Sequence, residues 1–388
     1  MYKCHYCDFN SYAFNQSEIP HQSYTQTLLK EFELRKRYFE NDADFGFSPK
    51  SRVSSVFFGG GTPSLMRISD LADLIDFFAR EYEFDEQVEI TLECNPGTVT
   101  KKLWRDFRSV GVNRVSIGVQ SLSEKYLHRF GRIHSADEAL KAVTEALDSG
   151  LFRVNADLIF GFPGQELSEW QSDLDEILQT GLSHLSCYAL TAEEGTIYSK
   201  ALRRKEYCET ESELFAEMLN YTYARTQEYG LPAYEVSNFA KPGEESLHNL
   251  GYWRYQSYIG LGAGATGNFF TRQIVSQNCP ESRIVVLRTQ NVRNPESYRI
   301  GVQKEKCDTF EKIDLKTAMS EFMLMGLRLT EGVSKAEFEC RFGRVASNVY
   351  GEAIDKAIQQ GWLKDIEGRL KPTLPGFIFN NALSLLFL

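Results

Sequence analysis

Two cysteines near the start of the chain, Cys4 and Cys7, have the spacing of a metal or redox site. Thiolates three residues apart can bind one zinc ion, hold part of an iron–sulfur cluster or form a redox dithiol. Tyr6 lies between them and could cover one side of whatever the pair binds. The pair alone leaves these three kinds of chemistry open, so residues further along the chain must decide between them.

A run of three glycines, Gly59–Gly61, is followed by Thr62 directly after a predicted strand. Because glycine has no Cβ, this backbone can approach a ligand closely, with its N–H groups facing an anion or its carbonyls facing an ammonium. The run lacks the GxGxxG pattern of dinucleotide-binding folds and the GK[ST] of phosphate-binding loops. A ligand contact and an ordinary tight turn both stay open.

Polar residues lie at or near the ends of the next predicted strands: Glu93 ends the second, Gln120 follows the third, and Asp157 lies inside the fourth. In a parallel barrel the carboxyl ends of the strands open on one face, where active sites are built. We therefore expect these three residues and Gly59–Thr62 to meet at one mouth, with Asp157 facing the barrel interior. The plainer alternative is that Asp157 is an internally satisfied polar group.

The segments that carry these residues alternate between predicted strands and predicted helices. Runs rich in Val, Ile, Leu and Phe predict six buried strands, at Val53–Phe58, Val88–Glu93, Arg114–Val119, Val154–Phe160, His184–Leu190 and Ala233–Val236. Such continuously apolar runs are typical of parallel strands covered on both faces. The helical periodicity between them predicts right-handed βαβ units. The fold class is therefore α/β, with a partial (β/α) barrel and a small, mostly helical C-terminal domain.

The pattern changes after about residue 240. Gly and aromatic residues are frequent in 247–267, and Asn278–Asn294 is expected to be irregular. Helical periodicity returns in Lys316–Phe342, and a β-ribbon is expected around Leu370–Thr373. The predicted domains are a barrel core over 1–235, a connecting region over 236–305 and a C-terminal domain over 306–388.

Composition excludes several classes of function. The 388 residues include 42% hydrophobic and 25% charged residues with a net charge of −10, which argues against binding to a nucleic-acid backbone. No apolar run reaches the ~18 residues that suggest a transmembrane helix, and no signal peptide precedes Cys4. The remaining cysteines look like reduced thiols of a cytoplasmic protein. They are Cys94, Cys187, Cys208, Cys279, Cys307 and Cys340.

Several motifs occur together in one order. They are Cys4-His5-Tyr6-Cys7, Gly59-Gly60-Gly61-Thr62-Pro63, Glu93-Cys94-Asn95-Pro96, Gly118-Val119-Gln120-Ser121, Arg132, Asp157–Pro163, Tyr234–Pro242, His248–Trp253 and Met323–Leu329. In this order and approximate spacing, the chain resembles the radical S-adenosylmethionine proteins of the oxygen-independent coproporphyrinogen III oxidase-like family. The stretches Tyr234–Pro242 and His248–Trp253 resemble those of its heme chaperone branch. The resemblance covers nearly the whole chain and implies a radical SAM barrel.

The resemblance implies a [4Fe–4S] cluster and S-adenosylmethionine. In this family three thiolates bind three irons, and the fourth iron binds the amino and carboxylate groups of S-adenosylmethionine. The cluster could then reduce the sulfonium to give a deoxyadenosyl radical. Cys4 and Cys7 would be two of the cluster ligands. The implied S-adenosylmethionine contacts are Tyr6, Gly60, Gly61, Thr62, Glu93, Gln120, Arg132 and Asp157, the last three at positions that in the oxidase branch touch a second molecule.

The sequence departs from the family pattern in two places. The first cysteine of CxxxCxxC would fall one residue before Met1, and the strand that normally precedes it, with its cofactor-contacting tyrosine, would be missing as well. The favoured explanation for the missing cysteine is a start codon assigned too late, and the alternative is a truncated or degenerate copy. His5 as a substitute ligand of the cluster also stays open. The oxidases carry CxC where this chain has Cys7-Asp8-Phe9. This difference favours heme binding over porphyrinogen decarboxylation.

His248 is the candidate heme ligand, because imidazole is a common axial ligand of heme iron. Asn249 belongs to the same motif, and Tyr252 and Trp253 could offer flat faces to a porphyrin. A satisfied structural histidine is the plainer alternative. Relatives often carry a second histidine where this chain has Thr266, which weakens a two-histidine site.

Three functions stay open at this stage. The favoured one is a heme chaperone that hands heme to an apo-protein of the respiratory chain and uses an electron donor. The second is oxygen-independent coproporphyrinogen III oxidation, and the third is a remnant without a cluster. For Arg132 itself, the plainer alternative is a pairing with Glu138 on the solvent side. The sequence does not identify the acceptor or the electron donor, or decide whether the protein forms a homodimer.

Overall fold

The computed structural model describes residues 3–12, 15, 18–41, 52–150, 153–276, 279–306 and 308–388. The chain divides into two compact units. Unit 1 comprises Met1–His21 and Arg52–His248, and unit 2 comprises Gln22–Ser51 and Asn249–Leu388. Each unit thus combines segments that are far apart in the sequence. Among the described helices, none is both long and apolar enough to span a bilayer.

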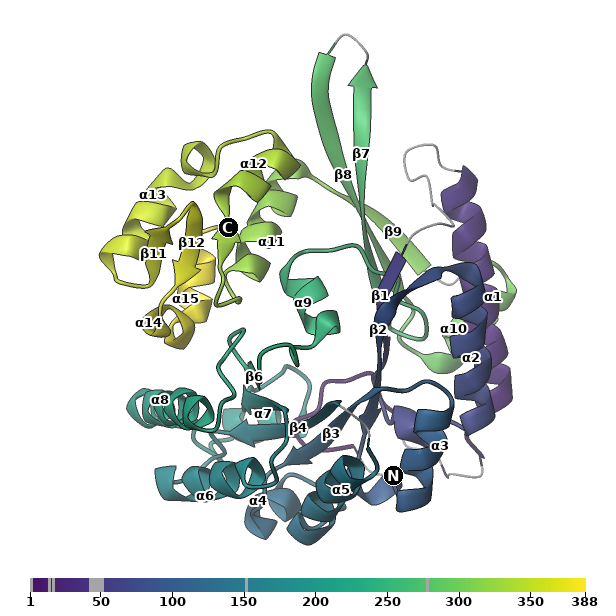
Figure 1. Cartoon of the computed structure of the whole chain (residues 1–388), viewed down its shortest axis with the longest axis vertical. Helices are drawn as coiled ribbons and strands as arrows, with labels where there is room; N and C mark the ends of the chain where they lie inside the picture. Colours follow the sequence, from purple (N-terminus) through teal and green to yellow (C-terminus); the bar gives the residue numbers. More distant parts are fainter. Residues whose placement is uncertain are drawn as a thin grey trace. The chain divides into compact units, whose positions relative to one another are not determined.

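Unit 1 is built on a six-stranded sheet with the order β1-β2-β3-β4-β5-β6. The first five strands run parallel to one another, and β6 runs antiparallel to β5. The strands are β1 Arg52–Phe58, β2 Glu83–Cys94, β3 Arg114–Gln120, β4 Arg153–Phe160, β5 His184–Ala189 and β6 Asn238–Ala240. The curled parallel sheet is a partial barrel, which confirms the predicted fold class (Figure 1).

Helices follow the strands and cover the outer face of the sheet (Figure 1). They are α2 Ile68–Glu81, α3 Lys101–Ser109, α4 Glu124–Arg129, α5 Ala136–Asp148, α6 Leu167–Leu178, α7 Ile197–Arg203 and α8 Ser212–Glu228, with short 3-10 turns at Pro63–Leu65 and Pro96–Thr98. The outer core is mostly apolar: Val115 and Ile117 of β3 are completely buried, as are Ala139 and Val143 of α5. Burial of these side chains stabilises the βα units.

The opposite, inner face of the sheet is polar. Ser116, Asn155, Ser186 and His184 lie on this face and form one hydrogen-bonded set. The prediction of apolar cover on both faces is therefore wrong for the inner face. Alternate residues of β3, β4 and β5 serve the apolar outer core and this polar interior, because successive side chains of a strand point to opposite faces.

The sixth predicted strand, Ala233–Val236, is misplaced. The strand is Asn238–Ala240, and Ala233 makes only an isolated bridge to Phe239. The buried carboxylate of Glu235 accepts hydrogen bonds from the Ser237 N–H and the Asn238 amide, which closes a turn over the predicted residues. This side-chain acceptor competes with sheet pairing.

Unit 2 contains a three-stranded antiparallel sheet with the order β7-β8-β9. Its elements are α1 His21–Asn41, β7 Thr266–Ser276, β8 Cys279–Asn291, α10 Pro295–Gln303 and β9 Asp308–Ile313, and helix α9 Leu247–Trp253 begins in unit 1 and continues into it. The prediction that Asn278–Asn294 is irregular is wrong, because most of it is strand β8; Asn278 itself lies outside the described residues. Val286 and Leu287 of β8 are buried, so long-range pairing with β7 outweighs the polar local sequence.

The C-terminal part of unit 2 is mostly helical with a small β-ribbon, as predicted. Its elements are α11 Leu315–Gly326, β10 Val333–Ser334, α12 Lys335–Phe342, α13 Ala346–Gln359, β11 Leu363–Ile366, β12 Arg369–Pro372, α14 Leu374–Ile378 and α15 Asn380–Leu385. Aromatic and aliphatic residues of α11, α12 and α13, including Phe322, Phe338 and Ile354, form its core.

Candidate functional site

The segments that follow β1 and β2 meet at the carboxyl ends of the strands. The Gly60 N–H donates to Oε2 of Glu93 over 2.9 Å, and Nδ2 of Asn95 donates to Oγ1 of Thr62 over 3.1 Å. Two loops from different parts of the sequence are thereby joined at one edge of the sheet. The mouth predicted from the strand ends is therefore present for these residues.

Glycine is required at two positions of this loop for different reasons. Gly60 has φ +113°, in the region that residues with a Cβ rarely adopt. A Cβ on Gly59 would overlap the Phe57 ring and lie 3.2 Å from Cδ of Glu93. The run therefore lets the backbone pass close to Phe57 and Glu93, which a residue with a side chain could not do without displacing them.

Two carboxyl groups at the mouth have raised pKa values. Burial raises the pKa of Glu93 to about 7, with the charge of Asp157 adding to the effect and the Gly60 hydrogen bond opposing it. Burial also raises the pKa of Asp157, although Ser116 and Asn155 each donate a hydrogen bond to it over 2.8 Å. Glu93 is thus close to half ionised near neutral pH, so a cationic ligand would be needed to hold it fully charged.

Gln120 ends β3 with an unusual backbone. Its φ is +71°, which is uncommon for a residue other than glycine and indicates local strain. A Cβ on Gly118 would lie 2.7 Å from Nε2 of Gln120 and 3.4 Å from Nη2 of Arg132. The Gln120 side chain therefore folds back over Gly118, and the absence of a side chain there makes room for it.

Arg132 connects this strand end to the N-terminal cysteines. Its Nη2 donates to the carbonyl of Gly118 over 2.7 Å and to Oδ1 of Asn95 over 2.9 Å, and its Nη1 lies 3.5 Å from Sγ of Cys4. Glu138, the alternative partner considered above, instead closes a capping box on Ser135. Arg132 therefore belongs to the mouth rather than to the solvent side.

Cys4 and Cys7 are brought together by a tight turn, in which the Cys7 N–H donates to the Cys4 carbonyl over 3.1 Å. Both thiols are free and partly buried, and burial raises the pKa of Cys7. Nδ1 of His5 lies 3.0 Å from the carbonyl of Arg129, so one ring nitrogen of this alternative ligand already has a partner. Within the described ranges no group of three or more His, Cys, Asp or Glu side chains could hold a metal ion.

These residues fit two corners of an iron–sulfur cluster with a polar organic ligand beside it. The Tyr6 hydroxyl and Nε of Arg132 are buried and lack a hydrogen-bond partner of good geometry among the described residues. Buried polar atoms normally have partners, so such orphans mark a place where a ligand would supply them. The Cys4–Cys7 turn supplies two thiolates, and the mouth supplies polar groups for an amino acid or a nucleoside.

His248 lies at the start of helix α9, and its ring stacks on Phe57 with the centroids 4.1 Å apart and the planes 9° from parallel. Burial lowers the pKa of His248 to about 4, so the imidazole is neutral near pH 7. A neutral imidazole has a lone pair available for a metal. The chemistry of this side chain therefore fits an axial ligand of heme iron.

The other residues of the motif, Asn249, Tyr252 and Trp253, follow on the same helix. Tyr252 packs edge-on against Tyr258, and the Trp253 ring lies under the Arg328 guanidinium, 5.1 Å away. A cavity of about 160 Å³ adjoins these aromatic rings. It is smaller than the ~300–1,000 Å³ typical of small-molecule pockets and does not enclose a porphyrin, so the fit to heme rests on His248.

Residues 1–177 match the Radical SAM superfamily, and residues 313–379 match the HemN C-terminal domain. The chain is 36% identical over 386 residues to heme chaperone HemW of Escherichia coli (strain K12). The matched region covers 100% of this chain and 95% of that relative. The chain belongs to the HemW family of radical SAM proteins. Heme chaperone HemW of Haemophilus influenzae is 35% identical to this chain, and the matched region covers 100% of this chain and 94% of that relative. The resemblance stated from the motifs is therefore confirmed.

A solved structure shares the fold. Coproporphyrinogen III oxidase (HemN) from Escherichia coli, a radical SAM enzyme, superposes with a TM-score of 0.77 at 17% sequence identity and covers 99% of this chain and 86% of that chain. At this identity the likeness establishes the architecture alone. A [4Fe–4S] cluster and S-adenosylmethionine are the cofactors that the radical SAM family implies.

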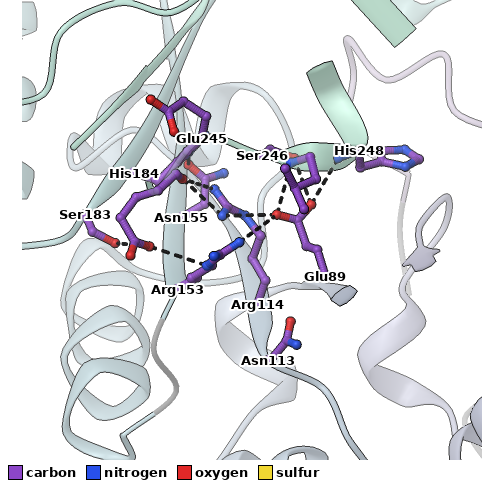
Figure 2. A network of polar contacts seen from close by, with 12 residues as sticks. Glu89, Asn113, Arg114, Arg153, Asn155, Ser183, His184, Glu245, Ser246 and His248 are labelled. Carbon is purple, nitrogen blue, oxygen red and sulfur yellow. Dashed lines mark hydrogen bonds and ion pairs between the residues drawn. The ribbon is translucent and has the colours of Figure 1, made fainter. Parts of the chain in front are cut away.

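The structure also contains a buried ionic network, not predicted from the sequence, that involves Glu89, Arg114 and Arg153 (Figure 2). Glu89 and Arg114 lie inside predicted apolar strands and are almost completely buried. Charged residues are rarely buried without a partner, so a charged residue within a predicted apolar strand indicates a buried ion pair. The pairing of these charges depends on strand order, which the local sequence does not give.

Proposed function

We propose that the chain binds heme through His248 and transfers it to an apo-protein that requires heme. The observation that carries the proposal is the neutral His248 imidazole, fixed on Phe57 at the first turn of α9. The relatives that match the whole chain are named heme chaperones, which supports the same function. The acceptor we favour is a respiratory heme protein, and an electron donor is an additional partner.

We further propose that the mouth of the barrel holds the cluster and S-adenosylmethionine. Cys4 and Cys7 would bind two irons, Tyr6 would lie beside the adenine, and Gly60, Gly61 and Thr62 would line the methionine end. When bound, the cluster supplies an electron and S-adenosylmethionine supplies a sulfonium that can accept it. The other proposed contacts to S-adenosylmethionine are Glu93, Gln120, Arg132 and Asp157, whose side chains gather around the strand ends.

A hemin titration tests the heme proposal. The purified chain is titrated with hemin under reducing conditions and followed by Soret absorbance, in parallel with His248→Ala and His128→Ala. His128 is an exposed histidine of α4 and serves as the control for loss of an imidazole. Loss of the metal ligand should weaken hemin binding by about tenfold or more and change the ligand-field bands. Equal affinity and spectra for the parent and His248→Ala would exclude His248 as the ligand.

Oxygen-independent coproporphyrinogen III oxidation is the second candidate. The gathering of Glu93, Gln120, Arg132 and Asp157 favours it. Phe9, at the position of the additional cysteine in oxidases, speaks against it. An anaerobic assay of the reconstituted protein with coproporphyrinogen III distinguishes the two, because protoporphyrinogen IX forms only if the oxidase reaction occurs.

A further inference from the structure

Glu89 is a buried carboxylate that is linked to the sheet by two arginines. It lies on β2 and is 1% exposed. Nη1 of Arg114, on β3, and Nη1 of Arg153, on β4, each lie 3.4 Å from its Oε2. An isolated charge in this position would be very costly, and the two arginines compensate the negative charge of the carboxylate inside unit 1.

Among the described residues, the other hydrogen bonds to the Glu89 carboxylate come from the start of helix α9, as Figure 2 shows. Oε1 accepts from Oγ of Ser246 over 3.2 Å and from the N–H of His248 over 3.1 Å. Oε2 accepts from the N–H of Leu247 over 3.1 Å. The first N–H groups of a helix have no partner within it, and the Glu89 carboxylate supplies one for two of them.

Helix α9 is short. It comprises seven residues, Leu247–Trp253, none of which is buried. A helix this short is unstable by itself and depends on tertiary contacts. The three hydrogen bonds to Glu89 supply such contacts at the first turn and constrain the backbone of His248.

The same patch of the sheet constrains the ring of His248. Ser55 of β1 pairs with Glu89 of β2, and Phe57 lies two residues beyond Ser55 and therefore on the same face. Phe57 stacks on the imidazole, as described above, while Glu89 holds the backbone of the same residue. Two neighbouring strands thus constrain both the backbone and the ring of His248.

We propose that Glu89 is a positioning residue for the heme ligand. By binding the start of α9, with its charge compensated by Arg114 and Arg153, it fixes the position from which the His248 imidazole reaches the iron. The inference rests on the proposed function, because it assumes that His248 is the ligand. Partners that orient a metal-binding histidine commonly contribute about 10–100-fold to metal affinity, although they never touch the metal.

The test compares Glu89→Gln with a matched substitution elsewhere in unit 1. Glutamine keeps the size of the side chain but removes the charge and one of the two acceptor oxygens. Asp173→Asn is the control, because Asp173 is also a buried carboxylate with the same kinds of donor. It accepts hydrogen bonds from the Ser121 hydroxyl and from the backbone N–H of Leu122. The readouts are hemin affinity, the ligand-field spectrum, and amide hydrogen exchange of Leu247 and His248.

Glu89→Gln should weaken hemin binding by about tenfold or more and alter the spectrum. Exchange of the two amides should accelerate to a similar degree, since their acceptor is weakened. Asp173→Asn should leave all three readouts at the parent values. If Glu89→Gln does not fold, Ser246→Ala removes one hydrogen bond and keeps both ion pairs, and should cause a smaller loss of the same kind. The proposal is overturned if Glu89→Gln keeps the hemin affinity and the amide exchange rates of the parent. If Glu89→Gln does not fold, the same result in Ser246→Ala overturns it.

A double substitution separates positioning of His248 from a general structural role. In a His248→Gly background, Glu89→Gln should cause no further loss of hemin affinity, because Glu89 acts only through this histidine. An additive further loss would show a different role and overturn the inference. If His248→Gly itself binds hemin like the parent, the proposed heme site fails first. If His248→Gly weakens binding and Glu89→Gln does not, only the role of Glu89 fails.

Discussion

The raised pKa of Glu93 makes the stability of the protein depend on pH in a way that one substitution removes. Glu93 is partly buried at the end of β2, and burial raises its pKa from 4.5 to about 7. The folded protein therefore keeps a proton on Glu93 over a pH range in which the unfolded chain has already released it. Glu93→Gln removes this ionisation and retains a carbonyl oxygen that can accept the Gly60 N–H.

The sign and size of the effect follow from this difference. Because the folded state binds the extra proton, ionisation of Glu93 destabilises the fold as the pH rises from 4.5 to about 7. Each pKa unit is worth about 1.4 kcal/mol, so the maximum is about 3 kcal/mol above pH 7. Glu93 is partly exposed and solvent reduces this figure, so we expect about 1–3 kcal/mol.

Chemical denaturation at pH 5 and pH 8 measures the effect. Unfolding is followed by the fluorescence of Trp104 and Trp170, which are fully buried in unit 1. The free energy of unfolding of Glu93→Gln, relative to the parent, should rise by about 1–3 kcal/mol from pH 5 to pH 8. Glu86→Gln removes an exposed charge from the same strand and controls for net charge. If Glu93→Gln and the parent differ by the same free energy of unfolding at both pH values, the pKa of Glu93 is not raised in the folded protein.

Three further outcomes are expected. Hemin affinity should stay constant from pH 8 to pH 5 and fall only near pH 4, where His248 takes up a proton; a loss centred at pH 6.5 in a Soret titration would contradict this. Gly118→Ala should displace Gln120 and weaken S-adenosylmethionine binding in calorimetry, while stability changes by less than about 1.5 kcal/mol, since the clash is with a flexible side-chain end. Cys4→Ser should lower the iron bound after anaerobic reconstitution, whereas exposed Cys208→Ser should not.

Local sequence was a good guide to the parallel part of the sheet and a poor guide to the antiparallel parts. The runs that became β1, β3 and β4 are rich in branched apolar residues whose own preferences agree with their final state. Strand β8 has a polar first half and forms because β7 pairs with it over its length. Strand β6 has three residues, and the side chain of Glu235 decides where it begins.

The family, the parallel α/β architecture and the residue types around the mouth can all be predicted from the sequence, because glycine runs, strand ends and cysteine spacing are local signals. How these residues act on one another depends on their arrangement in the folded protein. The pKa of Glu93 depends on its burial near Asp157, and Arg132 reaches Cys4 from a distant segment. The role inferred for Glu89 depends on strand order, since its partners come from three other segments and burial gives their charges and hydrogen bonds their strength.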